Sequence, residues 1–237
     1  RPSQMKTLVV VPTYNERENI TNFMDRFLAE VPEADLLVVD DSSPDGTFQL
    51  VEERSQKDSR VHLLLRTAKE GLGRAYIAGF RWALEKNYDV IVQMDADFSH
   101  RFEDLNRMLE EIQNYDVCLG SRWVSGGGTL NWGLSRKIIS RGGSFYSRRI
   151  LGFPIRDWTG GFNAWKAEVL RAIDFESLVS EGYSFQIELK YRALKKGFRL
   201  KEVPILFEDR RVGQSKMSSR IMIEALLSVW KFRLWRA

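Results

Sequence analysis

The sequence predicts an α/β fold in which an open, mainly parallel β-sheet carries helices on both faces. Short runs of apolar, β-favouring residues alternate with helical patterns through the first half of the chain. These runs are continuously apolar rather than alternating, which is typical of strands buried on both faces. The chain has 237 residues, 43% of them hydrophobic, so it can bury the core of one large domain.

The first half of the chain contains five expected strands and four expected helices. The strands are 8–11, 36–39, 61–65, 90–94 and 117–119. Between the first two strands, Ile20, Phe23 and Phe27 recur at helical spacing, and Pro32 lies just beyond them. Similar patterns predict helices over 47–55, 73–85 and 103–113.

The second half departs from simple strand–helix alternation. A Gly-rich, Trp-bearing loop over 124–133 precedes a basic helix expected over 134–151. Another helix is expected over 183–196, and 202–207 is typical of a strand. Pro204 places that strand at a sheet edge, because proline cannot donate to a β-ladder.

Three segments are expected along the chain. Residues 6–217 form one domain, since no linker or repeat interrupts them, whereas 1–5 contain a Met preceded by four residues that we take as foreign to the protein. Residues 218–237 are amphipathic and basic, and they either close the core or lie on a membrane surface. No apolar run is long enough to span a bilayer, and Cys118 is the sole cysteine, so a cytoplasmic location is expected.

The positive charge is concentrated in one block. Lys and Arg total 36 against 32 Asp and Glu, for a net charge of +4. Residues 122–156 hold seven cations and no acid. This block indicates a surface that faces phosphates, with an ordinary basic surface as the alternative.

Polar and acidic residues follow three of the expected strands, at 12–16, 39–47 and 94–100. In an open parallel sheet, ligands bind beyond the carboxyl ends of the strands, so these segments are the first candidates for a site. Some of their residues are also good helix caps, namely Asn15, Ser43, Asp45 and Thr47.

Capping does not account for Asp95 and Asp97. Two carboxylates one residue apart at the end of a buried strand can share a hard divalent cation, which prefers oxygen ligands and accepts phosphate oxygens at its remaining positions. An isolated Asp-x-Asp is a weak signal on its own. The pair therefore predicts a Mg²⁺ or Mn²⁺ site only in combination with other motifs.

The combination resembles a known family. The segments 12–16 (PTYNE), 40–47 (DDSSPDGT), 95–97 (DAD) and 120–122 (GSR), in this order, are similar to family 2 glycosyltransferases of the GT-A fold. Three later segments resemble the dolichol-phosphate or polyprenol-phosphate mannose synthases: 136–142 (RKIISRG), 157–162 (DWTGGF) and 209–216 (DRRVGQSK). The resemblance runs from about Lys6 to Met217.

The resemblance implies a Rossmann-like GT-A domain that transfers mannose from GDP-mannose to a dolichyl or other polyprenyl phosphate. It implies Mg²⁺ or Mn²⁺ as cofactor, peripheral contact with the cytoplasmic face of a membrane, an optional membrane-anchoring partner subunit, and no nucleic acid. Asp97, with Asp95, would hold the metal, while Ser99 stays open as a ligand. The residues implied for the nucleotide sugar are Pro12, Tyr14, Glu16, Val38, Asp40, Asp95, Ala96, Asp97, Arg122, Arg210 and Lys216.

The mechanism is indicated by a missing acidic pair. Many relatives carry a Glu-Asp pair late in the domain as a base, but this chain reads EGYSFQ at 181–186. A lipid phosphate is already anionic, so it can attack the anomeric carbon directly, with inversion, while the protein holds two anions in line. Spacings of four and five place Ser140 and Arg141 near the helix face of Arg136. With Arg122 they form the expected acceptor-phosphate site, and with Asp97 the catalytic set.

Three alternatives remain open. A UDP-glucose-dependent polyprenyl-phosphate glucosyltransferase would share these motifs. A haloacid-dehalogenase-type phosphatase also has an Asp-x-Asp, but near the start of its domain, whereas 95–97 follow the fourth expected strand. An inactive module that binds nucleotide sugar or lipid is disfavoured by the retained acidic and basic residues.

Overall fold

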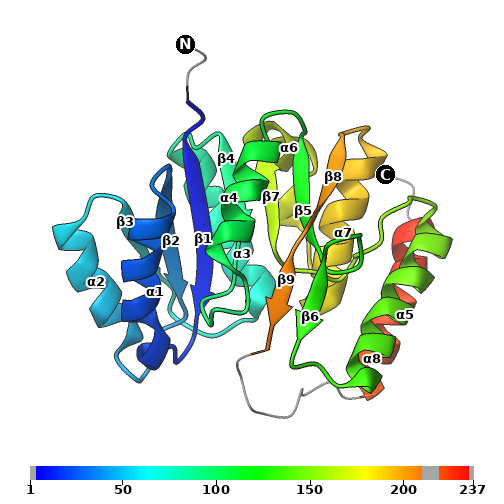
Figure 1. Cartoon of the computed structure of the whole chain (residues 1–237), viewed down its shortest axis with the longest axis horizontal. Coiled ribbons are helices and arrows are strands. Elements are labelled where there is room, and N and C mark those ends of the chain that lie inside the picture. The colour runs from blue at the N-terminus through cyan, green and yellow to red at the C-terminus, as the bar shows by residue number, and fades with distance from the viewer. Residues whose placement is uncertain (1–3, 210–218, 235–237) are drawn as a thin grey trace.

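The structure, a computed structural model, describes residues 4–209 and 219–234. Its centre is a seven-stranded sheet in the order β3-β2-β1-β4-β7-β5-β8, beside a two-stranded sheet of β6 and β9 (Figure 1). The strands are β1 (Thr7–Thr13), β2 (Ala34–Asp40), β3 (Val61–Leu65), β4 (Val90–Gln93), β5 (Val117–Ser121), β6 (Gly128–Leu130), β7 (Asn163–Lys166), β8 (Leu200–Pro204) and β9 (Leu206–Glu208).

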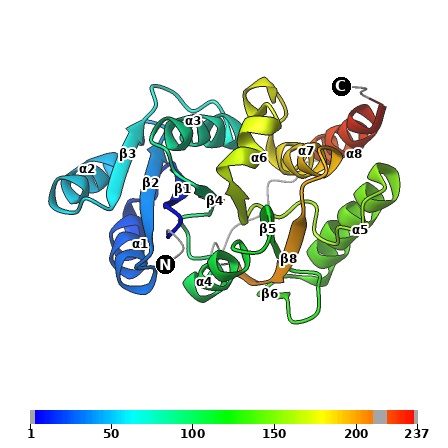
Figure 2. The same ribbon diagram turned by 90° about the horizontal axis from the view of Figure 1, so that it is seen from above.

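Helices cover both faces of the large sheet, as expected of strands without a polar face (Figure 2). One apolar cluster includes residues of α1 (Arg17–Glu30), α2 (Thr47–Lys57) and α4 (Phe102–Glu111). The other cluster holds residues of the remaining helices: α3 (Leu72–Glu85), α5 (Leu134–Leu151), α6 (Ala167–Ala172), α7 (Gly182–Lys195) and α8 (Ser219–Leu234). A short 3₁₀ helix, η1 (Phe175–Ser177), joins α6 to α7. The predicted α/β architecture is confirmed.

The order of the strands creates a switch point between β1 and β4. From β1 the chain winds to β2 and β3 on one side, whereas β4 pairs with the other edge of β1 and ends at Gln93, opposite Val10. Since β4 ends there, the loops after β1 and β4 can separate and leave room for a ligand. Pro12 lies beyond this last pair, where its missing N–H costs no ladder bond to β4.

Strand β7 is the one element of the large sheet that sequence reasoning did not anticipate. It runs antiparallel between β4 and β5, and its pairs extend from Val90↔Lys166 to Leu119↔Asn163. The expected strand over 202–207 is divided at Ile205 between β8 and β9. The predicted edge position is confirmed, because β8 is the last strand of the large sheet.

Helices α5 and α8 lie side by side at the β8 end of the molecule, away from α2 and β3 (Figures 1 and 2). The Tyr146 hydroxyl on α5 donates to the backbone oxygen of Leu226 on α8 at 3.1 Å. Within the described ranges, none of the helices has the length and apolar character needed to cross a bilayer.

Candidate active site

The loops after β1 and β2 are held together by a buried carboxylate. Asp40 has no exposed surface, and its Oδ1 accepts hydrogen bonds from the hydroxyls of Thr13 and Ser43, both at 2.7 Å. Its Oδ2 accepts from the Ser43 backbone N–H at 2.8 Å. Asp40 therefore organises the two loops, and its carboxylate oxygens are engaged by the protein itself.

The four residues singled out as helix caps join the two loops, and Asp45 also accepts from the first N–H of α2, the helix that follows it. The Asn15 N–H donates to Ser43 Oγ at 2.9 Å, and the Glu16 N–H donates to Thr47 Oγ1 at 3.1 Å. The two carboxylate oxygens of Asp45 accept from the first N–H groups of α1 and α2, those of Arg17 and Thr47. The start of one helix is thus satisfied by the loop of the other.

Within this preformed region, Tyr14 presents the accessible aromatic surface. Its side chain is 38% exposed, and the Lys69 ammonium lies 4.2 Å from its ring centroid. Glu16 is buried, and its carboxylate accepts from Asn19 Nδ2 at 3.2 Å. Tyr14 can therefore stack on a planar ligand such as a base, while the Lys69 ammonium interacts with the ring by a cation–π contact.

The loop after β4 places Asp95 and Asp97 at the same edge of the sheet as Tyr14. Burial raises the pKa of the Asp95 carboxyl to about 7, and the Asp97 carboxylate adds to the shift. Asp97 Oδ1 accepts from the Ser99 N–H at 3.1 Å, and the Ser99 carbonyl accepts from the Glu208 N–H of β9 at 3.1 Å. The loop is thus tied to β9 through the backbone of Ser99.

This pair fits a divalent cation that is shared with a substrate. Burial and the charge of Asp97 keep the Asp95 carboxyl partly protonated. A bound cation would stabilise the ionised form of both carboxylates. Within the described residues no group of three or more His, Cys, Asp or Glu could hold a metal ion. The other ligands of an ion at Asp95 and Asp97 would come from phosphate oxygens and water, as is usual for Mg²⁺.

His100 is a site residue to which sequence reasoning gave no role. Its Nδ1 accepts from the Asp95 N–H at 3.2 Å, and its ring stacks on Phe162 with centroids 4.5 Å apart. Burial, followed by the nearby charge of Arg122, lowers the pKa of His100 to about 3. His100 is therefore a neutral ring that holds the Asp95 backbone, with its proton on Nε2.

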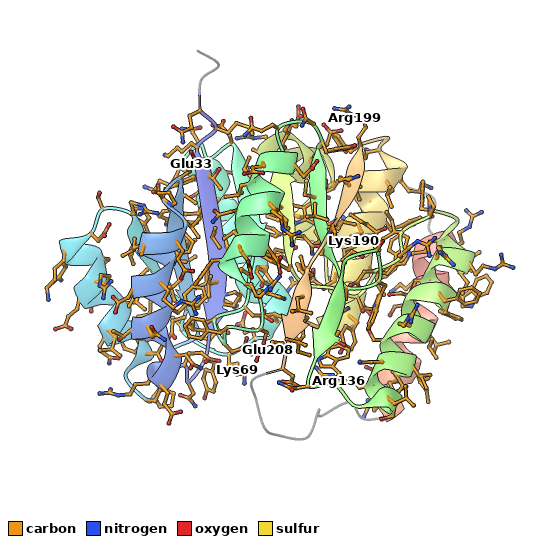
Figure 3. All side chains as sticks on the ribbon, viewed as in Figure 1. Glu33, Lys69, Arg136, Lys190, Arg199 and Glu208 are labelled. Atoms are coloured by element: carbon orange, nitrogen blue, oxygen red, sulfur yellow. The ribbon has the colours of Figure 1, made fainter. Side chains whose placement is uncertain are left out.

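A cavity of about 380 Å³, here called the strand-end cavity, opens beside Asp95. It lies where β4 and β5 end and where β7, α5 and α7 begin, and Figure 3 shows the labelled Arg136 at this edge of the molecule. Its lining residues are Leu72, Asp95, His100, Arg122, Trp132, Arg136, Thr159, Gly160, Gly161, Phe162, Gly182, Tyr183, Gln186, Ile205 and Phe207.

Arg122 lines this cavity but is also paired inside the protein. Its Nε and Nη2 each lie 2.8 Å from a carboxylate oxygen of buried Asp157, and its Nη2 donates to Thr159 Oγ1 at 3.1 Å. Burial works against both charges, but the pairing outweighs it: the pKa of Arg122 is raised and that of Asp157 is lowered. Asp157 thus largely neutralises the positive charge that Arg122 would present to a ligand.

Lys190, on α7, supports residues 157–160 from inside the protein (Figure 3). Sequence reasoning also gave it no role. Its ammonium donates to the backbone oxygens of Gly160 at 2.7 Å and Trp158 at 2.8 Å. Burial lowers the pKa of Lys190 to about 7, although Asp157 acts in the opposite direction. The sequence offered one signal for Lys190. Asp157 is the first acid after the acid-free block, and a buried Asp requires cationic partners.

A second cavity of about 540 Å³, here called the helix groove, lies between α5, α7 and α8. It shares Trp132, Arg136, Thr159 and Tyr183 with the strand-end cavity. Its other lining residues are Ser135, Ile139, Ser140, Gly142, Gly143, Tyr146, Ser147, Ile187, Met222, Ala225, Leu226 and Val229, most of them apolar or small. The two cavities thus adjoin at Arg136, and Asp95, His100 and Arg122 line only the strand-end cavity.

Arg136 stands at this junction. Its guanidinium lies 4.0 Å from the centroid of the Trp132 ring and forms an ion pair with Asp209. The Ser140 hydroxyl and the Trp132 indole N–H are sealed from water, yet neither has a hydrogen-bond partner among the residues that the structure describes. Buried donors are rarely left unsatisfied, so these two groups beside a cation would be satisfied by an anionic ligand once the side chains that cover them move.

Several predicted site residues lie elsewhere. Arg141 lines neither cavity, since five residues of α-helix turn by about 140°. Its guanidinium lies 5.5 Å from the ring of Trp123, which packs against Trp132, and its role stays a prediction. Val38 and Ala96 are buried in the core and line neither cavity. Arg210 and Lys216 lie outside the described residues, so their predicted phosphate contacts stay predictions.

Comparisons with known proteins agree with this geometry. Residues 8–174 match the family described as Glycosyl transferase family 2. An undecaprenyl-phosphate mannosyltransferase of Micrococcus luteus is 49% identical over 230 residues, covering 97% of this chain and 95% of that protein. A polyprenol monophosphomannose synthase of Mycolicibacterium smegmatis is 47% identical over 237 residues, covering 98% of this chain and 89% of that protein.

Solved structures agree on the fold. A glucosyl-3-phosphoglycerate synthase of Mycobacterium tuberculosis with Mn²⁺ and UDP-glucose superposes with a TM-score of 0.71 at 16% identity, covering 96% of this chain and 79% of that one. A mannosyltransferase of Pyrobaculum calidifontis with GDP-Man and Mn²⁺ gives a TM-score of 0.60 at 16% identity, covering 98% of this chain and 71% of that one. With the family match over 8–174, the predicted GT-A fold is confirmed, and the chain belongs to glycosyl transferase family 2.

Proposed function

We propose that this glycosyltransferase transfers mannose from GDP-mannose to a polyprenyl phosphate, giving a polyprenyl-phosphate mannose with inversion at the anomeric carbon. The observation that carries the proposal is that the two cavities adjoin at Arg136. The strand-end cavity reaches Asp95, while the helix groove is lined mainly by apolar and small residues, which suit an isoprenoid chain. Two relatives with 47% and 49% identity are named for a polyprenol or undecaprenyl-phosphate substrate, which supports the same acceptor.

The donor is assigned to the edge where β1 and β4 end. Tyr14 offers a face for the base, and a divalent cation at Asp95 and Asp97 would offset charge on the departing diphosphate. Mn²⁺ is present in both solved neighbours, one of which also holds GDP-Man, so a divalent metal is supported without a choice between Mg²⁺ and Mn²⁺.

The acceptor phosphate is assigned to Arg136, with Ser140 and the Trp132 indole N–H as further donors. All three line the helix groove, and the two donors lack partners among the described residues. Residues 181–186 supply no acidic pair that could act as a base, and none is needed, because a phosphate oxygen is already anionic. The work of the protein is to hold two anions in line despite their repulsion.

A membrane-facing surface is part of the proposal. Helices α5 and α8 expose a set of large apolar side chains: Leu134, Ile138, Ile139, Phe145, Ile223, Leu226, Leu227, Trp230 and Leu234. Cations accompany them, including Arg148 and Arg149 near the Phe145 ring. An apolar surface with basic residues suits the interface of an anionic bilayer, where the acceptor lipid resides. An anchoring partner subunit stays a prediction.

The test is to offer GDP-mannose, UDP-glucose and related donors with a polyprenyl phosphate and Mg²⁺ or Mn²⁺, and to identify the lipid product. We expect mannose transfer from GDP-mannose, and NMR of the product should show a β-linked phosphodiester from the α-linked donor. Glucose transfer from UDP-glucose would favour the alternative donor. A product of retained configuration would exclude direct displacement, and release of free phosphate without a sugar product would favour a phosphatase.

A further inference from the structure

Gln186 stands on the wall of the strand-end cavity, at the amino-terminal part of α7, where a catalytic acidic pair is absent. The residue is buried, so its amide is fixed by neighbours rather than by solvent. A chain of hydrogen bonds behind Gln186 sets which end of that amide faces the cavity.

The chain begins at Trp165, on β7. Its indole N–H can only donate, and it donates to Gln93 Oε1 at 2.9 Å. Asn163 Nδ2 donates to the same oxygen at 3.0 Å. The amide of Gln93 is thereby oriented with its nitrogen toward α7, since the reverse orientation would bring two donors together at the indole.

The orientation is then passed on to Gln186. Gln93 Nε2 donates to Gln186 Oε1 at 3.2 Å, so the oxygen of Gln186 is occupied from inside the sheet. Its other end, Nε2, makes no hydrogen bond among the described residues and is not among the polar atoms sealed from water. A Cβ added to Gly161, another cavity residue, would lie 3.3 Å from this nitrogen.

We propose that the Gln186 amide N–H donates to a hydroxyl oxygen of the donor's hexose and thereby contributes to sugar recognition. The proposal rests on the proposed function, and it places the transferred sugar in the strand-end cavity beside Asp95. A neutral donor suits a neutral hydroxyl, whereas the acceptor phosphate is assigned to the Arg136 guanidinium and the donor diphosphate to a metal at Asp95 and Asp97. An oriented amide also discriminates between sugars, because a hydroxyl that points elsewhere leaves the N–H unsatisfied.

The experiment compares wild type with Gln186→Met, which keeps the side-chain length but removes the donor. Calorimetric titration with GDP and with GDP-mannose, both with Mn²⁺, separates the nucleotide from the sugar. We expect GDP affinity within twofold of wild type and GDP-mannose binding, or turnover, weakened about threefold to tenfold, as for loss of one neutral hydrogen bond. Equal weakening of both ligands, or no weakening of either, would overturn the proposal.

GDP-mannose analogues that each lack one hydroxyl locate the contact. Wild type should lose affinity for the analogue that lacks the recognised hydroxyl, and Gln186→Met should lose nothing further with that analogue. If the two losses add for every analogue, Gln186 does not contact the sugar. A wild-type enzyme that binds UDP-glucose and not GDP-mannose would instead contradict the proposed donor, and the Gln186 comparison would then be made with UDP and UDP-glucose.

Trp165→Phe tests the orienting chain without touching the cavity wall. Removing the indole donor lets the amides of Gln93 and Gln186 turn, so we expect the same sugar-specific loss, but smaller. Thermal unfolding of both variants distinguishes this from a general loss of packing, which would weaken GDP and GDP-mannose alike. Full sugar selectivity in a folded Trp165→Phe protein would show that the chain does not orient Gln186.

Discussion

The loops after β1 and β2 differ from the α5–α8 end of the molecule in how completely the protein satisfies its own side chains. In the loops, Asp40 and Asp45 accept hydrogen bonds from both segments, and the geometry is complete without a ligand. At the α5–α8 end, Ser140 and Trp132 keep unmatched donors, and large apolar side chains face outward. The loops after β1 and β2, here called the donor half, are thus preformed. The α5–α8 end, here called the acceptor half, is complete only with a lipid and a membrane surface.

The region between the two halves is built from buried charge. The Arg122–Asp157 pair and the Lys190 ammonium fix residues 157–160, which line or support both cavities. Buried pairs contribute little net stability, but removing one partner is costly, so their value here is positional. Because residues 157–160 are fixed beside both cavities, each anionic substrate can be bound separately while the reacting atoms of the two still meet in line.

The largest expected effect is on the donor side, at Asp97. Asp97→Asn should lower turnover by about three orders of magnitude at saturating Mg²⁺ or Mn²⁺, because it removes half of the carboxylate pair that would share the cation. Circular dichroism and thermal unfolding should match wild type. Substitution at Asp89, a carboxylate at the opposite end of β4, serves as the control, and near-normal activity of Asp97→Asn would contradict the metal assignment.

On the acceptor side, Arg136→Ala should reduce kcat/KM for polyprenyl phosphate about tenfold to a hundredfold, as expected for loss of one charge-assisted contact to phosphate. GDP affinity should stay within twofold, measured by calorimetry with Mn²⁺. Lys137→Ala is the matched control, since Lys137 carries the same charge on α5 and lines neither cavity. If Arg136→Ala abolishes GDP binding, the division between the halves is wrong.

The region between the two halves can be tested through Lys190, whose pKa in the folded protein is lowered to about 7. Above pH 7 the folded protein releases this proton while the unfolded chain keeps it up to about pH 10.4, so stability rises with pH in that window. The free energy of unfolding of wild type minus that of Lys190→Met should therefore increase between pH 7 and 9, by at most ~1.4 kcal/mol per pH unit.

Urea titrations at pH 6, 7, 8 and 9 measure this difference. Below pH 7 both states of wild type hold the proton, so the difference should be flat. A difference that stays flat up to pH 9 would show that Lys190 stays charged in the folded protein.

The smallest effect is expected at the membrane-facing surface. Leu227 is 65% exposed on α8, and Leu227→Ser should weaken binding to anionic vesicles severalfold, since one leucine side chain is worth about 1.5–3 kcal/mol when fully buried. Sedimentation with phosphatidylglycerol-containing vesicles measures it. Leu65→Ser, at the opposite edge of the sheet, is the control. Equal loss in both variants would mean that this surface does not contact the bilayer.

Local patterns predicted much of this molecule, and the failures have physical causes. The basic helix predicted from Leu134 to about Leu151 is confirmed as α5, and Gly152 ends it in the left-handed conformation. Strand β7 was missed because it is four residues long and is inserted between β4 and β5 from far along the chain. Sequence order does not reveal which strands become neighbours.

The site was predicted less evenly than the fold. Asp95 and Arg136 were found because their motifs are local, and both line the strand-end cavity. His100, Gln186 and Lys190 were not given roles, since each acts through partners distant in sequence. Arg141 lines neither cavity, because a spacing of five turns a residue away from the helix face of Arg136.

The most direct test of the difference between the halves is hydrogen–deuterium exchange with each substrate added alone. GDP with Mn²⁺ should slow exchange in residues 12–17 and 94–101 and leave α5 and α8 nearly unchanged. A short-chain polyprenyl phosphate should slow exchange in α5 and α8 and leave the loops after β1 and β2 unchanged, because the lipid is assigned to the helix groove and does not contact them. Protection of α5 and α8 by GDP alone, with no further change on adding the lipid phosphate, would contradict the division into a preformed donor half and an incomplete acceptor half.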